Sequence, residues 1–373
     1  MEEDIFFMRR ALALARRGEG RVNPNPLVGA VVVRGGTILG EGWHEAFGGL
    51  HAERNAFASC VRNGQPADGA TLYVTLEPCC HWGKTPPCTD AVIEKGISRV
   101  VAGSLDPNPL VSGNGIRLLR EAGIAVETGV LQEQCEELNK VFFHYIKEKT
   151  PYVTMKYAMT MDGKTATAAG HSKWITESPA RVRVHEDRNR HMAIMTGVGS
   201  VLADDPLLSC RIPDARQPVR LICDTRLRTP PEARIVRTAA EQPTWILTCC
   251  AEKERQEVYQ KQGCRILELE QKDGHVDLAK AMERLGGEGI DSVYLEGGSE
   301  LNASALAAGI VQGVHCYIAP KLFGGERART PVGGRGVTFP DQARQLTIRK
   351  VTPYGNDLLL ECSVKDSRKN SAE

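Results

Sequence analysis

The stretch LEPCCHWGKTPPC, from Leu76 to Cys88, places three cysteines and a histidine in a loop bounded by prolines. It follows a strand-like run, ATLYVTLEPC, and leads into a helix-like run, CTDAVIEKG. Taken alone, the stretch fits a disulfide, a structural zinc knuckle or part of an active site. Four zinc ligands from this loop, Cys79, Cys80, His81 and Cys88, are an awkward set, because adjacent cysteines rarely bind one ion without strain. The deciding residues lie elsewhere in the chain.

The sequence LHAERNA supplies a partner for this loop, because it puts His51 and Glu53 at the start of a predicted helix. A His-x-Glu followed by Pro-Cys and a second cysteine is the pattern of zinc nucleobase deaminases, in which one histidine and two cysteines hold the metal. The glutamate of that pattern is not a ligand; it takes a proton from the attacking water and passes it to the leaving amine. The combination predicts a catalytic zinc site with three protein ligands.

The cysteine spacing departs from the short form of this pattern, which has two residues between the cysteines. Three positions after Cys79 and three after Cys80 there is no cysteine, so the second cysteine ligand is expected to be Cys88. The insertion between the ligands carries His81 and Lys84. A loop that bulges from a metal site is well placed to contact substrate.

The bulk composition narrows the class of protein. A chain of 373 residues is long enough for two domains. A net charge of +1 and only 5% aromatic residues argue against nucleic-acid binding or attraction to a membrane surface. There is no run of about 18 apolar residues, and the first twenty residues read as an amphipathic helix starting near Asp4 rather than as a signal peptide. The twelve cysteines are therefore expected to be reduced thiols in a cytoplasmic protein.

Strand and helix signals alternate almost throughout, which predicts an α/β protein. The first domain, 1–147, is expected to have a mixed sheet covered by helices on both faces. A boundary is expected in IKEKTPYVTMK, where a charged run ends at Pro151 and a new strand begins. The second α/β domain is expected over 151–365, followed by a polar tail, 366–373.

In the second domain, two strand-to-helix turns are rich in glycine: AIMTGVGSVLADD and SVYLEGGSELNASAL. Such turns let backbone N–H groups approach a phosphate, so a pair of them predicts a nucleotide-type ligand in the crevice at the strand ends. Arg226 and Arg228, in DTRLRTP after another strand, suit a ribose 2′-phosphate and hence NADP.

The motifs of the first domain resemble those of a known family. NPNPLVGAVVV, HAE, VTLEPCCHWGKTPPC and DPNP, in this order, look like the bifunctional deaminase–reductases of riboflavin biosynthesis. The resemblance implies a three-layer α/β/α deaminase domain with zinc (Zn²⁺) on His51, Cys79 and Cys88, and Glu53 as proton shuttle. We favour Cys79 over its neighbour Cys80 because it follows Pro78 directly. The implied substrate is a diaminopyrimidinone bearing a ribosylamino 5′-phosphate, contacted by Asn25, His44, His81 and Lys84.

The resemblance continues through MKYAMTMDGKTA, SKWIT, TGVGSVLADDPLL and LEGGS, and spans about residues 1–365. It implies a dihydrofolate-reductase-like domain that uses NADPH to convert the ribosyl group to ribityl. Residues expected along NADPH are Ala158, Trp174, Ser200, Asp204, Thr225, Glu296, Gly297 and Gly298. Residues expected around the reductase substrate are Lys156, Ser172, Thr176, Arg188, Leu208, Arg211 and Glu296, with the two arginines as phosphate anchors. A homo-oligomer, a dimer or tetramer, is also expected.

Two other interpretations remain open at this stage. The reductase-like domain could be non-catalytic, a scaffold beside a working deaminase. In this half, TMDGK stands where SLDGK is usual, and Glu177 adds a negative charge near a site for anionic ligands. A zinc-stabilised nucleic-acid-binding protein is the interpretation from another class, and the near-zero net charge argues against it.

Overall fold

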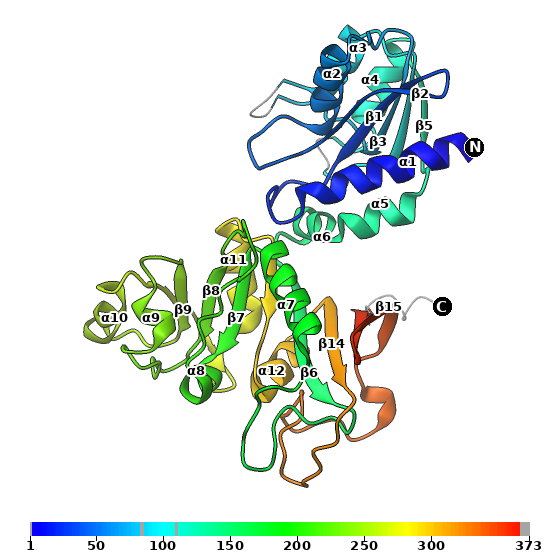
Figure 1. Ribbon diagram of the computed structural model, residues 1–373. Helices are drawn as coiled ribbons and strands as arrows, with labels where there is room; N and C mark the ends of the chain where they lie inside the picture. Colours follow the sequence, from blue (N-terminus) through cyan, green and yellow to red (C-terminus); the bar gives the residue numbers. More distant parts are fainter. Residues whose placement is uncertain (1, 83–85, 109–110, 366–373) are drawn as a thin grey trace. The chain divides into compact units, whose positions relative to one another are not determined.

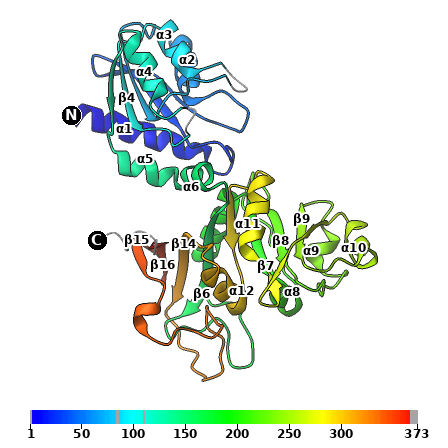
Figure 2. The ribbon, with the colours of Figure 1, turned by 180° about the vertical axis from the view of Figure 1, so that it is seen from behind.

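The computed structural model describes residues 2–82, 86–108 and 111–365. The chain divides into two compact units, Met1–Lys149 and Thr150–Glu373 (Figures 1 and 2). Each unit has its own sheet and its own cores, and each is described by itself below. The predicted tail, 366–373, lies outside the described residues.

Unit 1 contains a five-stranded sheet in the order β2-β1-β3-β4-β5. β1 pairs antiparallel with β2 and β3, and β3, β4 and β5 run parallel, so the sheet is mixed as predicted. The β1–β2 hairpin turns at Gly35 and Gly36, which both have positive φ, the backbone conformation that a two-residue hairpin turn requires. The strands are β1 (Gly29–Arg34), β2 (Thr37–Trp43), β3 (Thr71–Leu76), β4 (Arg99–Ser104) and β5 (Ala125–Thr128).

Helices cover both faces of this sheet, which confirms the predicted three-layer arrangement (Figure 1). On one face, apolar residues of α2, α3 and α4 pack against Val32, Val74 and Val100; on the other, α1 and α5 pack against Val31 and Val101. The helices are α1 (Glu2–Ala15), α2 (Ala52–Arg62), α3 (Cys88–Glu94), α4 (Asn114–Glu121), α5 (Gln132–Leu138) and α6 (Lys140–Glu148), with a short 3-10 turn, η1 (Arg16–Gly18).

Two glycines of β2 let helix α2 lie directly on the strand. A Cβ atom on Gly42 would lie 2.3 Å from the backbone nitrogen of Ala56 and 2.5 Å from the carbonyl oxygen of Ala52. A Cβ on Gly40 would meet the carbonyl of Ala56 at 2.5 Å. No larger residue fits without displacing the helix backbone. The glycines therefore set the position of α2, whose first turn carries Glu53.

Unit 2 contains a nine-stranded sheet in the order β10-β9-β8-β7-β13-β6-β14-β16-β15. The first seven strands in this order are parallel, and β16 and β15 add an antiparallel hairpin at one end. The carboxyl ends of the seven parallel strands thus meet at a single edge. The strands are β6 (Tyr152–Thr160), β7 (Ala193–Gly197), β8 (Val219–Cys223), β9 (Thr244–Thr248), β10 (Arg265–Glu268), β13 (Ser292–Leu295), β14 (Gly313–Ala319), β15 (Leu346–Tyr354) and β16 (Asp357–Val364).

Helices again cover both faces of the sheet (Figure 2). Residues of α11 and α12 pack on the face that bears Met195 and Leu221, and residues of α7, α8, α9 and α10 pack on the face that bears Ile194 and Tyr294. The helices are α7 (Ser178–Arg190), α8 (Val198–Asp204), α9 (Arg234–Arg237), α10 (Lys253–Gln260), α11 (Leu278–Gly287) and α12 (Ser299–Ala307), with a 3-10 turn, η2 (Pro340–Gln342), and a small ribbon, β11 (Gln271–Lys272) and β12 (His275–Val276).

The carboxylate of Asp187 ties α7 to the sheet. It is buried, and burial opposes its ionisation, yet hydrogen bonds and nearby positive charges hold its pKa well below the usual range. It accepts hydrogen bonds from His315 (3.2 Å), Arg190 (3.2 Å), Tyr294 (3.3 Å) and Tyr317 (3.3 Å), and it forms an ion pair with Arg183 (3.0 Å). Because these donors come from α7, β13 and β14, Asp187 joins elements that lie more than 100 residues apart in sequence.

We expect unit 2 to lose stability as the pH falls from about 6.5 towards 4, because of His191. Its Nδ1 donates to the carbonyl of Asp187 (2.7 Å), and its Nε2 accepts from the hydroxyl of Thr154 (3.0 Å), so the folded state holds a neutral ring. Burial lowers the pKa of His191 to about 4. The unfolded chain, with a pKa near 6.5, binds the extra proton in this window, so the stabilisation is complete above 6.5 and is lost as the pH falls through 4.

Urea unfolding of the wild type and of His191→Gln across pH 4–8 checks this. A shift of this size corresponds to at most about 3 kcal/mol. The variant should be less stable at pH 7 but have a flatter pH dependence. Equal pH slopes for the two proteins would rule out His191 as the source.

Candidate zinc centre and reductase crevice

The three predicted zinc ligands lie together in unit 1. The Nδ1 atom of His51 is 3.5 Å from the sulfur of Cys79 and 3.3 Å from the sulfur of Cys88. All three donor atoms lie within 4.8 Å of one another. Hydrogen bonds from Cys88 and His51 lower the pKa of the Cys79 thiol to about 4, which favours the thiolate that a metal binds.

These donors fit a tetrahedral zinc ion. Zinc–sulfur bonds of about 2.3 Å and zinc–nitrogen bonds of about 2.0 Å put the sulfur and nitrogen atoms of a tetrahedron about 3.5 Å apart. The observed separations are 3.3 and 3.5 Å. A set of one imidazole and two thiolates leaves a fourth position for water, as in a catalytic rather than a structural site.

Glu53 lies buried beside this donor set. It is the second residue of α2, two positions after His51, which is the N-cap residue of that helix. Its side chain is only 3% exposed. Burial, with the charge on Cys79, raises the pKa of Glu53 above its ordinary value. A carboxyl group with a raised pKa releases and regains a proton more evenly near neutral pH, as a proton shuttle requires.

The elements that carry the ligands meet at one end of the sheet. His51 caps α2, Cys79 follows the carboxyl end of β3, and Cys88 is the first residue of α3. The backbone N–H groups of Cys88 and Thr89 both donate to the carbonyl of Cys79, at 3.0 and 3.2 Å. The loop between the cysteines is therefore closed at its base, which places the two sulfur atoms side by side despite nine residues of separation.

Of the predicted deaminase substrate contacts, Asn25 and His44 lie beside the ligands. The amide nitrogen of Asn25 donates to Nε2 of His44 (3.1 Å), so Nδ1 of that ring carries the proton and donates to the carbonyl of Leu50 (3.0 Å). The rings of His44 and His51 are in edge contact, with centroids 5.5 Å apart. Lys84 lies outside the described residues; His81 is exposed, and Cys80 is a half-buried thiol whose pKa burial raises.

The carboxylate of Glu77 was not anticipated from the sequence. It is buried and accepts backbone N–H groups from Asp106 (3.2 Å), Gly113 (3.0 Å) and Ile116 (3.3 Å). It thus joins the strand end that carries Cys79 to the loop after β4 and to the start of α4. A glutamate between a strand and Pro-Cys was visible in LEPC, but its partners lie about 30 to 40 residues further along the chain.

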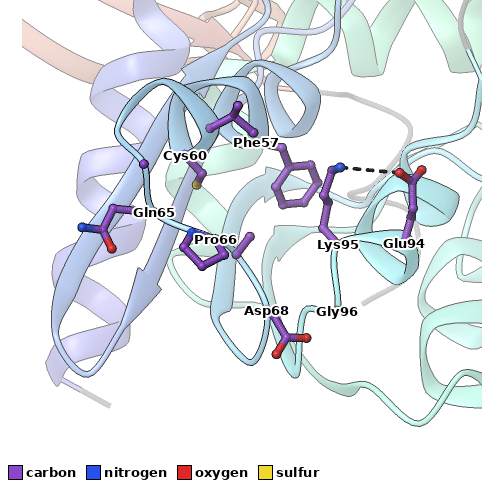
Figure 3. A pocket seen from close by; sticks show the side chains of 11 residues that line it. Phe57, Cys60, Gln65, Pro66, Asp68, Glu94, Lys95 and Gly96 are labelled. Atoms are coloured by element: carbon purple, nitrogen blue, oxygen red, sulfur yellow. Dashed lines mark hydrogen bonds and ion pairs between the residues drawn. The ribbon is translucent and has the colours of Figure 1, made fainter.

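A hollow on the surface of unit 1 does not coincide with this site. It has a volume of about 420 Å³ and is lined by Phe57, Cys60, Pro66, Asp68, Lys95 and their neighbours (Figure 3). These residues include the carboxyl ends of α2 and α3, whereas His51 and Cys88 stand at the amino ends of the same helices. At about 1.5 Å per residue, Cys60 lies roughly 13 Å along α2 from His51.

In unit 2, the predicted cofactor residues gather at the carboxyl edge of the parallel strands. Ser200 follows β7, Thr225 follows β8, and Glu296 to Gly298 follow β13. The two glycine-rich turns touch, since a Cβ on Gly298 would lie 3.6 Å from the hydroxyl of Ser200. Between β7 and β13 the strand order reverses, which is where open α/β sheets bind nucleotide ligands.

Glu296 is the centre of a buried ion-pair group in this crevice. Its carboxylate accepts two hydrogen bonds from the guanidinium of Arg188, at 2.6 and 2.9 Å, and lies 3.6 Å from the ammonium of Lys156. Burial opposes ionisation, but the charges of Arg188 and Lys156 outweigh it and lower the pKa of Glu296 to about 2. Arg188 also donates to the carbonyl of Ser209 (2.8 Å), so three of its five N–H groups serve the protein itself.

The remaining predicted reductase residues differ in exposure. Arg211 is exposed and its guanidinium lies 3.2 to 3.3 Å from the ring of His185; Trp174 is exposed and stacks on Arg181 at 4.6 Å. Thr225 uses its hydroxyl to accept the backbone N–H of Val276 (3.2 Å). Leu208 and Thr176 are buried, Ala158 and Ser172 are half-buried, and Asp204, Arg226 and Arg228 are exposed.

The two departures noted in this half are accommodated by the fold. In TMDGK, the hydroxyl of Thr160 accepts the backbone N–H of Lys164 (3.0 Å), and Met161 is exposed. Glu177 accepts a hydrogen bond from Asn356 (3.1 Å) in the β15–β16 turn. Its charge is thus engaged by the hairpin rather than directed at Glu296 or its partners.

Over the described part of the chain, no helix combines the length and apolar character needed to cross a membrane. None of the twelve cysteines, all of which lie in the described residues, forms a disulfide.

Comparison with known proteins finds relatives for both units. Residues 1–104 match the cytidine and deoxycytidylate deaminase zinc-binding region, and residues 151–360 match the RibD C-terminal domain. The riboflavin biosynthesis protein RibD of Actinobacillus pleuropneumoniae is 53% identical over 358 residues, which cover 96% of this chain and 94% of that protein. RibD of Escherichia coli is 39% identical over 371 residues, covering 96% and 98%.

Solved structures give the same result over the full length. The crystal structure of a diaminohydroxyphosphoribosylaminopyrimidine deaminase/5-amino-6-(5-phosphoribosylamino)uracil reductase from Thermotoga maritima superimposes with a TM-score of 0.87 at 38% identity, covering 98% of this chain and 99% of that one. RibD of Acinetobacter baumannii gives 0.86 at 34% identity, with 98% and 99% covered. The chain belongs to the RibD family, the bifunctional zinc deaminases and NADPH-dependent reductases of riboflavin biosynthesis.

Proposed function

We propose that unit 1 deaminates 2,5-diamino-6-ribosylamino-4(3H)-pyrimidinone 5′-phosphate and that unit 2 then reduces its ribosyl group to ribityl. The observation that carries the first step is the triangle of His51, Cys79 and Cys88 with the buried carboxyl of Glu53 beside it. The observation that carries the second is the crevice at the strand order reversal, with two glycine-rich turns in contact.

In the deamination step, His51, Cys79 and Cys88 would hold zinc. Zinc bound there supplies a water activated near neutral pH. Glu53 takes a proton from that water and returns it to the amino group that leaves as ammonia. The hydrogen-bonded pair of Asn25 and His44 is placed to orient the pyrimidine ring, because the His44 ring borders the ligand His51.

In the reduction step, bound NADPH would be the source of the hydride that the anomeric carbon of the ring-opened sugar accepts. The turns at Ser200 and Gly297–Gly298 let the backbone approach the phosphates of the cofactor. Lys156 is the cation beside Glu296 with the fewest protein partners, and it is placed to contact the sugar or its phosphate. Arg211, exposed at the rim, is the better candidate for the phosphate anchor, because Arg188 is largely engaged by Glu296.

The test is incubation of the purified chain with the phosphorylated diaminopyrimidinone, with and without NADPH. Ammonia release without NADPH, followed by NADPH consumption, is the expected result. Ammonia release with no NADPH consumption would leave the reductase-like unit non-catalytic. No ammonia release from the zinc-loaded protein would refute the deaminase assignment.

We further propose a cytoplasmic location and a homo-oligomer. Twelve cysteines without a disulfide suit a reducing compartment. For the oligomer, the support is β15, the last strand of the sheet, which presents apolar residues on the same face as Leu360 and Cys362 of its partner strand. Ile348 is 59% and Val351 51% exposed. An edge strand with exposed apolar residues is a place where another chain docks, and a second copy offers a matching strand.

We expect the double substitution Ile348→Glu and Val351→Glu to separate the copies. Charges on this face would have to be buried in the interface without partners. Analytical ultracentrifugation should give a multiple of the chain mass of 40.7 kDa for the wild type and the single-chain mass for the variant. An unchanged assembly in the variant would place the interface elsewhere.

A further inference from the structure

The segment that leads into the ligand Cys88 consists of two prolines, Pro86 and Pro87. Proline has no backbone N–H, so this segment can be fixed by backbone hydrogen bonds only through its carbonyl oxygens. Both carbonyls are taken by one side chain: Nη2 of Arg54 donates to Pro86 at 3.1 Å and to Pro87 at 2.9 Å.

Arg54 belongs to the first turn of α2, next to Glu53 and three residues after His51. The backbone bonds from Cys88 and Thr89 tie the second cysteine to Cys79, but not to α2. The side-chain bonds of Arg54 run from the turn that carries the histidine ligand and the proton shuttle to the residues directly before Cys88. They therefore connect His51, at the start of α2, with Cys88, at the start of α3.

We infer that Arg54 is a positioning residue of the zinc centre, which holds Cys88 at its distance from His51 and Glu53. This inference rests on the proposed assignment of His51, Cys79 and Cys88 as zinc ligands. Two N–H groups on one planar guanidinium nitrogen suit two consecutive carbonyls, whereas a lysine ammonium is a point donor on a flexible stem. Residues that orient metal ligands commonly alter metal affinity 10- to 100-fold when replaced.

The experiment uses the full zinc-loaded chain. Arg54→Met keeps an unbranched side chain of similar length beside Phe57 and Ala91 in the groove between α2 and α3, but removes both hydrogen bonds. We expect its zinc affinity, measured by competition with a chromophoric chelator, to fall roughly 10- to 100-fold. The kcat for deamination should fall while KM changes little, and Arg54→Lys should show a smaller loss. The control is Arg62→Met, at the exposed last turn of the same helix, with unchanged affinity.

Thermal unfolding of the zinc-free and zinc-loaded forms separates positioning from a merely structural role. Wild-type zinc affinity in Arg54→Met, or equal stability losses in both forms, would overturn the inference. A cooperative unfolding transition of unit 1 in the same thermal scans reports whether the variant is folded; if Arg54→Met is not, the same readouts are taken on Arg54→Lys. Cys88→Ala tests the ligand assignment separately from the role of Arg54. If this variant binds zinc as tightly as the wild type, the proposed ligand set itself fails.

Discussion

Glu53→Gln is expected to reduce the deamination rate by roughly 10²- to 10⁴-fold, the usual contribution of a positioned general acid–base group. The amide has nearly the same size as the carboxyl group, so the buried site should keep its packing. It cannot accept the proton of the attacking water or deliver one to the leaving amine. Because Glu53 is not a ligand, the variant should still contain zinc. Ammonia release and metal content, measured on the same sample, check both statements.

Two controls make this result specific. Glu94→Gln alters an exposed carboxylate at the far end of α3 and should deaminate normally. The Glu53 variant should also consume NADPH at the wild-type rate when given the deaminated substrate, because the change lies in unit 1. A zinc-loaded Glu53→Gln protein with more than a tenth of the wild-type deamination rate would refute the role assigned to this residue.

Glu296→Gln is expected to have the largest effect on unit 2. The carboxylate forms ion pairs with both Arg188 and Lys156, and its side chain is only 13% exposed. Removing one partner of a buried ion pair typically costs about 3–5 kcal/mol, because the remaining charges stay desolvated and unpaired. The side chains that line the crevice should also shift, and a displacement of the reacting groups by about 1 Å lowers reaction rates roughly 10²-fold. We therefore expect a lower urea midpoint and a roughly 10²-fold loss of NADPH oxidation.

The matched control is Glu300→Gln, one turn further along and exposed on α12, which should leave both quantities unchanged. Deamination by Glu296→Gln should persist, because the substitution lies in unit 2. Full reductase activity in this variant would show that the Arg188–Glu296 pair is not needed in the crevice. A large loss of deamination would show that the substitution unfolds more than unit 2.

The zinc centre could be predicted from the sequence because its signals are local. His51 and Glu53 lie two residues apart, and Cys79 and Cys88 flank one loop. The spacing of these residues alone therefore indicates a zinc site with a glutamate beside it. The β1–β2 hairpin was equally accessible, since a Gly-Gly pair between apolar strands allows one type of turn. Helices α5 and α6, in contrast, were not among the predicted elements. In Gln132–Leu138, only Cys135 is buried, so the sequence carries little apolar periodicity there.

In the reductase half, the sequence indicated that glycine-rich turns end the strands, but not which turns meet. The contact of Ser200 with Gly298 depends on β7 and β13 being neighbours, although β13 is separated from β7 by nearly a hundred residues. The pairing of Arg188 with Glu296 has the same origin. From the sequence alone, Arg188 and Arg211 were equivalent candidates for the phosphate anchor. In the fold, Arg188 pairs with the carboxylate of Glu296, whereas Arg211 is exposed.

The sequence by itself thus determined the family and the two chemistries, and it predicted the zinc ligands and the proton shuttle, because the spacing of residues within one turn or one loop can be read without knowledge of the fold. Only the tertiary structure decided how those groups are held: the Glu77 carboxylate under the Cys79 strand end, the Arg54 guanidinium on two proline carbonyls, and the Glu296 ion pairs. Each of these links a charged side chain to atoms distant in the chain. Strand order and helix packing determine which atoms each of these side chains meets, and no local sequence pattern predicts them.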